Sequence, residues 1–125
     1  MSAAVPLFLS LAFACASPHA SDGDTLRCAV QGPVRLLAID APELPGHCRR
    51  GRVCTPGDPF ASTANLTRLL ARGRTVCHPV GRDRYNRILA RCATAGVDLS
   101  CAMVAGGFAV ERYSRLGACP VRRRD

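Results

Sequence analysis

An apolar segment at residues 34–43 constrains the fold more than any other feature, because it has the composition of a strand yet carries three charged residues. Arg35 lies near its start, while Asp40 and Glu43 flank Pro42 at its end. Proline cannot donate to a strand ladder, and the residue before it is pushed toward extended geometry. A strand that only filled a core would not need these charges. The segment therefore predicts a buried strand that ends at a functional site.

The spacing of Arg35 and Asp40 places a condition on this strand. Side chains of a straight strand alternate between its two faces, so residues an odd number of positions apart point to opposite sides. Arg35 and Asp40 are separated by five positions. Their side chains converge only if the strand bends or ends by Asp40, and the proline that follows favours such an end.

Two further segments carry acids and arginines that complement the central strand. Residues 21–25 read Ser-Asp-Gly-Asp-Thr, and residues 83–87 read Asp-Arg-Tyr-Asn-Arg. Carboxylates provide the hard oxygen ligands that divalent cations prefer, and guanidinium groups bind phosphate through paired hydrogen bonds. If the three segments meet, they supply the groups needed to cut a phosphodiester. The alternative is that the acids cap turns and the arginines form structural ion pairs.

The charge of the chain indicates a polyanionic partner. The 125 residues include 17 Lys+Arg and 9 Asp+Glu, which gives a formal net charge of +8, and all the basic residues are arginine. Such an excess attracts nucleic acids and anionic surfaces. A cationic protein that acts on membranes would need an amphipathic basic helix. The helix expected at residues 59–71 carries only Arg68, so nucleic acid is the favoured partner.

The eight cysteines indicate an oxidising compartment, because such a density is unusual for a reducing cytosol. No two have the C-x-x-C spacing and the three histidines complete no zinc-finger pattern, which favours disulfides over a metal cluster. Cys48 and Cys54 lie in one polar loop and are close enough in sequence to bond to each other. Cys77 and Cys92 would lie opposite each other in a hairpin centred on residues 84–85.

The N-terminal region predicts export. Residues 5–16 form an uncharged apolar run that is too short to span a bilayer but has the length of a signal-peptide core. We therefore expect a signal peptide at residues 1–20, one domain at residues 21–125, and a secreted or periplasmic protein without stable membrane insertion. The alternative is a buried first strand or helix that stays on the protein, because no Lys or Arg precedes the run.

The remaining patterns predict a mainly β chain with two helices. Asp58 and Pro59 provide a helix start for residues 59–71, and Asp98 caps a short helix at residues 99–105. We expect five short strands with the first helix between the third and the fourth, which is the order of an OB-type barrel. Four of these strands are assigned to residues 26–30, 34–43, 75–80 and 88–92.

Several short segments together resemble the staphylococcal nuclease (thermonuclease) family. They occur in the order and with the spacings of that family and cover residues 22–110. The resemblance implies a five-stranded OB barrel and a Ca²⁺-dependent phosphodiesterase that acts on DNA and RNA. The matching segments are Asp22-Gly23-Asp24-Thr25, residues 34–36 and 39–43, residues 83–87, and Val97-Asp98-Leu99 with Met103, Val104 and Gly107.

The resemblance implies a metal site and a base in this chain. Asp24 and Asp40 would bind Ca²⁺, with the backbone carbonyl of Ala41 as a further ligand. The family often has threonine where Ala41 stands, and a backbone ligand tolerates that change. Glu43 would be the general base or would orient the attacking water.

The resemblance also implies a set of substrate contacts. Arg35 and Arg87 would clamp the phosphate and stabilise the transition state. Arg84 and Tyr85 would contact the nucleotide, and Tyr113 would offer a stacking surface. The substrates would be single-stranded or denatured DNA and RNA, and the protein would act as a monomer.

Two departures from the family pattern leave an alternative function open. Removal of residues 1–20 would leave only a stub of the strand that usually precedes the Asp-Gly-Asp segment, and the C-terminal helix that usually closes the domain is missing from the sequence pattern. The cysteines are additions that could staple a shortened barrel. The alternative is an OB-fold module that binds nucleic acid but has lost catalysis.

Overall fold

A curled, mainly antiparallel sheet organises the protein, and the computed structural model describes residues 11–119. The sheet has seven strands in the order β1-β6-β7-β4-β3-β2, with β8 paired to β7, and β4 runs parallel to β7. Its strands are β1 (Phe13–Ala14), β2 (His19–Ala20), β3 (Thr25–Cys28), β4 (Gly32–Leu36), β6 (Thr75–Arg82), β7 (Ile88–Thr94) and β8 (Val97–Asp98). A second sheet pairs β5 (Ile39–Asp40) with β9 (Val110–Glu111).

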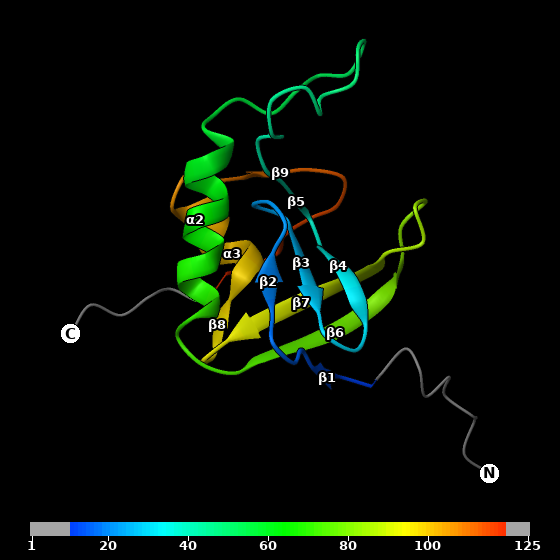
Figure 1. Ribbon diagram of the computed structural model, residues 1–125, viewed down its shortest axis with the longest axis vertical. Coiled ribbons are helices and arrows are strands. Elements are labelled where there is room, and N and C mark those ends of the chain that lie inside the picture. The colour runs from blue at the N-terminus through cyan, green and yellow to red at the C-terminus, as the bar shows by residue number, and fades with distance from the viewer. Residues whose placement is uncertain (1–10, 120–125) are drawn as a thin grey trace.

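Residues 11–119 are therefore mainly β with two helices, consistent with an OB-like barrel. Figure 1 shows the sheet curling beside helices α2 (Pro59–Leu70) and α3 (Leu99–Ala105). The described residues form nine strand segments instead of the five expected. The count differs because the central strand is divided in two, and because short pairings at both ends of the chain carry little sequence signal. In chain order, α2 lies between β5 and β6.

Both helices begin where their capping residues predict. The carboxylate of Asp58 accepts hydrogen bonds from the backbone N–H groups of Phe60 and Ala61, at 2.9 and 3.2 Å. Asp98 accepts a hydrogen bond from the N–H of Cys101 at 2.8 Å. These bonds satisfy backbone donors that have no partner within the first turn of a helix. The helices and the sheet enclose a core that includes Leu26, Val34, Leu36, Ile39, Leu66, Leu99 and Met103.

The central strand is interrupted at Ala38, and this interruption shapes the site. Ala38 has a φ of 70°, in the left-handed region that is uncommon for a residue with a Cβ atom. The interruption ends β4 at Leu36 and starts β5 at Ile39. It also allows two residues an odd number of positions apart to point to the same side, because the side chains of Arg35 and Asp40 approach each other to 3.3 Å.

The hairpin of β6 and β7 has the register that the cysteine positions predict. Cys77 lies directly opposite Cys92, and a disulfide joins them. Both strands extend beyond the ranges 75–80 and 88–92 expected from sequence, and a β-bulge lies between Pro79 and Gly81. The longer hairpin carries its polar turn past the sheet toward the site described below.

The segment before the Asp-Gly-Asp motif takes part in the sheet. Phe13 pairs with Cys77 across β1 and β6, and β2 pairs with β3. Cys15 forms a disulfide with Cys28. Residues 1–10, with much of the apolar run, lie outside the described residues. Signal-peptide cleavage after residue 20 stays a prediction, and it would remove two strands and one half of a disulfide.

All eight cysteines form disulfides. The structure contains the two pairs favoured by spacing, Cys48–Cys54 and Cys77–Cys92, together with Cys15–Cys28 and Cys101–Cys119. Within residues 11–119, no helix has the length and apolar character required to cross a membrane.

Candidate active site

The three charged segments singled out in the sequence meet at one cavity of about 830 Å³. The end of the central strand, the loop that follows it, the hairpin turn and the segment after β9 each contribute side chains to its wall. Its acidic lining residues are Asp22, Asp24, Asp40, Glu43 and Asp83, and its arginines are Arg35, Arg49, Arg52, Arg84 and Arg87.

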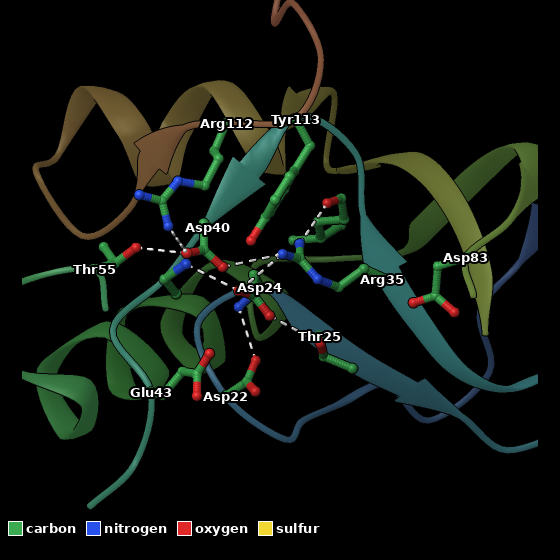
Figure 2. Close-up of polar contacts among 12 residues, drawn as sticks. Asp22, Asp24, Thr25, Arg35, Asp40, Glu43, Thr55, Asp83, Arg112 and Tyr113 are labelled. Carbon is green, nitrogen blue, oxygen red and sulfur yellow. Dashed lines mark hydrogen bonds and ion pairs between the residues drawn. The ribbon is translucent and has the colours of Figure 1, made fainter. Parts of the chain in front are cut away.

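Arg35 links two carboxylates at the floor of the cavity (Figure 2). Its Nη2 atom lies 3.4 Å from Oδ2 of Asp24 and 3.3 Å from Oδ1 of Asp40. Pairing of Arg35 with Thr25 in neighbouring strands places Asp24 beside the guanidinium, and the interruption at Ala38 turns Asp40 toward it. Residues 16 positions apart in sequence are thereby brought within contact distance of one group.

Asp40 receives more positive charge than sequence reasoning predicted. Its side chain is 3% exposed, and Nη2 of Arg52 and Nη1 of Arg112 lie 3.4 and 3.0 Å from its oxygens. The hydroxyl of Thr55 donates to Oδ2 at 2.5 Å. No local pattern indicates these contacts, because Arg52 and Thr55 lie in a polar loop and Arg112 lies in a basic tail.

Asp24 is a buried carboxylate with incomplete charge compensation. Burial raises its pKa to about 6, against the opposing effect of Arg35. Its oxygens accept hydrogen bonds from the N–H of Ala41 and the hydroxyl of Thr25, both at 2.9 Å. The preceding Gly23 packs against helix α2 so closely that a Cβ atom there would lie 1.8 Å from Oγ of Ser62. The glycine of the Asp-Gly-Asp motif is therefore required by packing.

The raised pKa predicts how Asp24→Asn changes stability with pH. Because the folded-state pKa exceeds the ordinary pKa of 3.8 for this carboxyl group, ionisation of Asp24 costs stability as pH rises from about 4 to about 6, and the full cost persists above that range. Asparagine removes this cost. Relative to the wild type, we expect the free energy of unfolding of Asp24→Asn in chelator to increase by about 2–3 kcal/mol between pH 4 and pH 8. Urea titrations at both pH values measure the difference, and parallel pH profiles would contradict it.

Glu43 lies in the same cavity but contacts the floor through Arg52. Its Oε1 atom is 2.5 Å from Nη1 of Arg52, and its side chain is 19% exposed. Figure 2 shows Glu43 on the same side of the site as Asp22 and Asp24. The placement leaves Glu43 accessible from the cavity, and its role as a base stays a prediction.

Arg87 lines the cavity from the hairpin turn. Its Nε atom lies 2.6 Å from Oδ2 of Asp83, and the backbone N–H of Arg87 donates to the same carboxylate at 2.9 Å. Although burial alone would raise the pKa of Asp83, the hydrogen bonds and charge of Arg87 lower it. Asp83 thus stays ionised and fixes the orientation of Arg87.

The aromatic candidates expose their rings beside arginines. The ring centroid of Tyr85 lies 5.3 Å from the guanidinium carbon of Arg84 and 5.4 Å from that of Arg87. The hydroxyl of Tyr113 accepts a hydrogen bond from Arg52 at 2.9 Å. Both tyrosines line the cavity and remain more than half exposed, at 52% and 71%.

The donor groups suit a hard divalent cation. Asp24 and Asp40 share one cationic partner, and the raised pKa of Asp24 shows that this buried carboxylate would gain from more positive charge nearby. Ala41 follows Asp40 directly. Residues 11–119 contain no group of three or more His, Cys, Asp or Glu that could hold an ion. A cation of the Ca²⁺ type would therefore complete its coordination with backbone, water or substrate oxygens.

Two comparisons with known proteins found sequence similarity. The sequence profile of the family described as "Staphylococcal nuclease homologue" matches residues 33–119. The probable endonuclease LCL3 of Verticillium alfalfae is 41% identical to this chain over 63 residues. This stretch is 49% of the chain and 20% of that relative, so the similarity spans about a fifth of the relative's length.

Proposed function

Because the chain belongs to the staphylococcal nuclease homologue family, we propose that it hydrolyses phosphodiester bonds of DNA and RNA in a Ca²⁺-dependent reaction. One observation carries the proposal. Arg35 contacts both Asp24 and Asp40 in a cavity that Glu43 and Arg87 also line. Cations that neutralise a phosphate thus lie beside acids that can bind a metal ion and accept a proton.

The protein groups divide the chemistry between them. Arg35 and Arg87 neutralise the phosphate, whose charge otherwise repels nucleophiles, and stabilise the additional charge of the five-coordinate transition state. Glu43 takes a proton from water while the water oxygen forms a bond to phosphorus, and the ester oxygen departs with the bond electrons. The carboxylates of Asp24 and Asp40, with the carbonyl of Ala41, would hold Ca²⁺, which when bound supplies positive charge to the phosphate.

The cavity wall favours unpaired nucleotides. Tyr85 and Tyr113 present exposed rings on which bases can stack, and Arg84 adds positive charge beside Tyr85. Bases within a duplex already stack on their neighbours, so such rings favour single-stranded or denatured DNA and RNA. The four disulfides support a secreted or periplasmic location, and we propose that the protein acts there as a monomer.

The test is cleavage of denatured DNA and of RNA by the oxidised protein, with Ca²⁺ or with chelator. We expect cleavage only with Ca²⁺, and we expect Arg87→Ala to lower kcat/KM by a factor of about 10²–10⁴ because a transition-state cation is lost. Arg82→Ala is the matched control, because Arg82 belongs to the same hairpin but donates to the backbone of Asn86.

The outcomes separate the two functions that the sequence left open. Cleavage that persists in chelator, or that is equal in Arg87→Ala and Arg82→Ala, would contradict the assigned chemistry. Binding of DNA without cleavage would instead support a nucleic-acid-binding module.

A further inference from the structure

Arg52 is carried into the cavity by a loop that closes on itself. The disulfide between Cys48 and Cys54 joins residues 6 positions apart, with their Cα atoms 6.0 Å from each other. Inside the loop, the backbone N–H of Arg52 donates to the carbonyl of Arg49 at 3.1 Å, and Gly51 has a φ of 82°. The turn is therefore compact, and the bond across it limits how far Arg52 can move.

The guanidinium of Arg52 joins the proposed base Glu43 to Asp40, one of the proposed metal ligands. Nη1 lies 2.5 Å from Glu43, while Nη2 lies 3.4 Å from Asp40 and donates to the hydroxyl of Tyr113 at 2.9 Å. The side chain is 37% exposed, so part of the fork is open to the cavity. Among residues 11–119, Arg52 is the one arginine whose ion pairs include both Glu43 and Asp40.

These contacts are incompatible with the proposed roles of Glu43 as a base and of Asp40 as a metal ligand. Nη1 of Arg52 occupies the side of Glu43 at Oε1, so this oxygen cannot contact an attacking water while the ion pair persists. Positive charge bound at Asp40 would also repel the guanidinium. When a cation and a substrate phosphate are bound, the ion pairs of Arg52 with these two acids are therefore disfavoured. The incoming phosphate provides an alternative anionic partner for Arg52.

We propose that Arg52 is a specificity-determining residue that binds the phosphate next to the scissile one. The inference rests on the proposed function. Arg35 and Arg87 already serve the scissile phosphate, whereas Arg52 enters from the loop after Glu43 and lies beside the exposed ring of Tyr113. Its planar fork matches two phosphate oxygens. Transfer of Arg52 to that phosphate releases Glu43, so a substrate with neighbouring phosphates frees the base.

The proposal predicts different effects of Arg52→Gln on two substrates. For a single-stranded oligonucleotide we expect KM to rise about tenfold with kcat not reduced, because a charged hydrogen bond to substrate is lost while Glu43 is freed. For bis(4-nitrophenyl) phosphate, which has a single phosphate, kcat/KM is expected not to fall. Arg50→Gln removes the same charge from the same loop at an exposed position outside the cavity lining. It should leave the ratio of the kcat/KM values for the two substrates unchanged.

Binding without cleavage gives a second readout. In chelator, Arg52→Gln should weaken binding of the oligonucleotide about tenfold by fluorescence anisotropy, and should reduce the slope of log K against log salt by about 0.7. Opening the loop with Cys48→Ser and Cys54→Ser should also weaken binding, but should have little further effect when Arg52→Gln is present. If the losses of binding affinity caused by opening the loop and by Arg52→Gln are fully additive, the claim that the loop acts through Arg52 would be overturned.

Other outcomes bear directly on the inference. If Arg52→Gln lowers kcat/KM equally for both substrates, Arg52 is a structural anchor of the loop. If it raises kcat/KM equally for both, Arg52 only blocks the cavity. Either result would overturn the proposal while leaving the nuclease function intact. A folded wild-type protein that neither binds nor cleaves nucleic acid would overturn both.

Discussion

Replacement of Glu43 by glutamine is expected to lower kcat for DNA cleavage by a factor of about 10²–10⁴, the usual contribution of a positioned base. Glutamine keeps the shape of the side chain but cannot take a proton from water. Binding of a single-stranded oligonucleotide in chelator is expected to persist, because the cations of the cavity remain. Stability should change little, since the lost pair with Arg52 is partly exposed to solvent. Steady-state kinetics and anisotropy measure these quantities.

The chain supplies a matched control for this experiment. Glu111 is its only other glutamate, and it accepts a hydrogen bond from the backbone of Leu116 outside the cavity lining. Glu111→Gln retains an acceptor oxygen and should leave kcat close to the wild-type value. A Glu43→Gln variant that cleaves as fast as Glu111→Gln would remove Glu43 from the mechanism.

A protein that begins at Ser21 is expected to be far less stable than the full chain. It would lose β1 and β2 and the bond between Cys15 and Cys28, and loss of a native disulfide alone costs about 2–5 kcal/mol. Urea unfolding of the oxidised proteins measures the cost, and a thiol assay should find one reactive group per molecule, from Cys28. The same comparison bears on the predicted signal peptide, because cleavage after residue 20 would produce this shortened protein.

Two variants separate the causes of that loss. Cys15→Ser combined with Cys28→Ser in the full chain removes only the disulfide, so it should cost less than the truncation. A truncated protein that unfolds at the same urea concentration as the full chain would show that residues 11–20 add no stability. The mass of the mature protein would then locate the cleavage site directly.

The features predictable from sequence were those encoded by neighbouring residues. Asp58 with Pro59, and Asp98, mark the two helix starts because a capping carboxylate acts on backbone groups only two or three positions away. The opposition of Cys77 and Cys92 followed from a hairpin whose turn lies midway between them. In each case a local pattern was sufficient, and tertiary contacts did not override it.

The central strand has a feature that local sequence patterns do not predict. Its charges predicted a strand that leads toward a cluster of acids and arginines, but nothing in the sequence identified Ala38 as a residue with a left-handed backbone. Glycine or asparagine usually marks that conformation, whereas alanine adopts it only when the surrounding structure imposes it. Here β4 pairs with β7 and β5 pairs with β9, so the two halves belong to different sheets.

The candidate site was predictable as a set of acids and arginines but not as a network. Arg52 and Arg112 reach Asp40 from 12 and 72 positions away, and no periodicity links such residues. The two-residue strands β1 and β2 were equally hard to predict, because an apolar run before an exported domain also has the composition of a signal peptide.

The disulfide pattern has a consequence for how the chain acquires its structure during synthesis. Each cysteine bonds to the next one along the chain: Cys15–Cys28, Cys48–Cys54, Cys77–Cys92 and Cys101–Cys119. Eight cysteines allow on the order of 100 pairings, and this is the one in which no bond encloses or crosses another. A polypeptide that emerges N-terminus first therefore presents every cysteine with its correct partner before the following pair appears. Oxidation in order of emergence gives the native bonds without reshuffling.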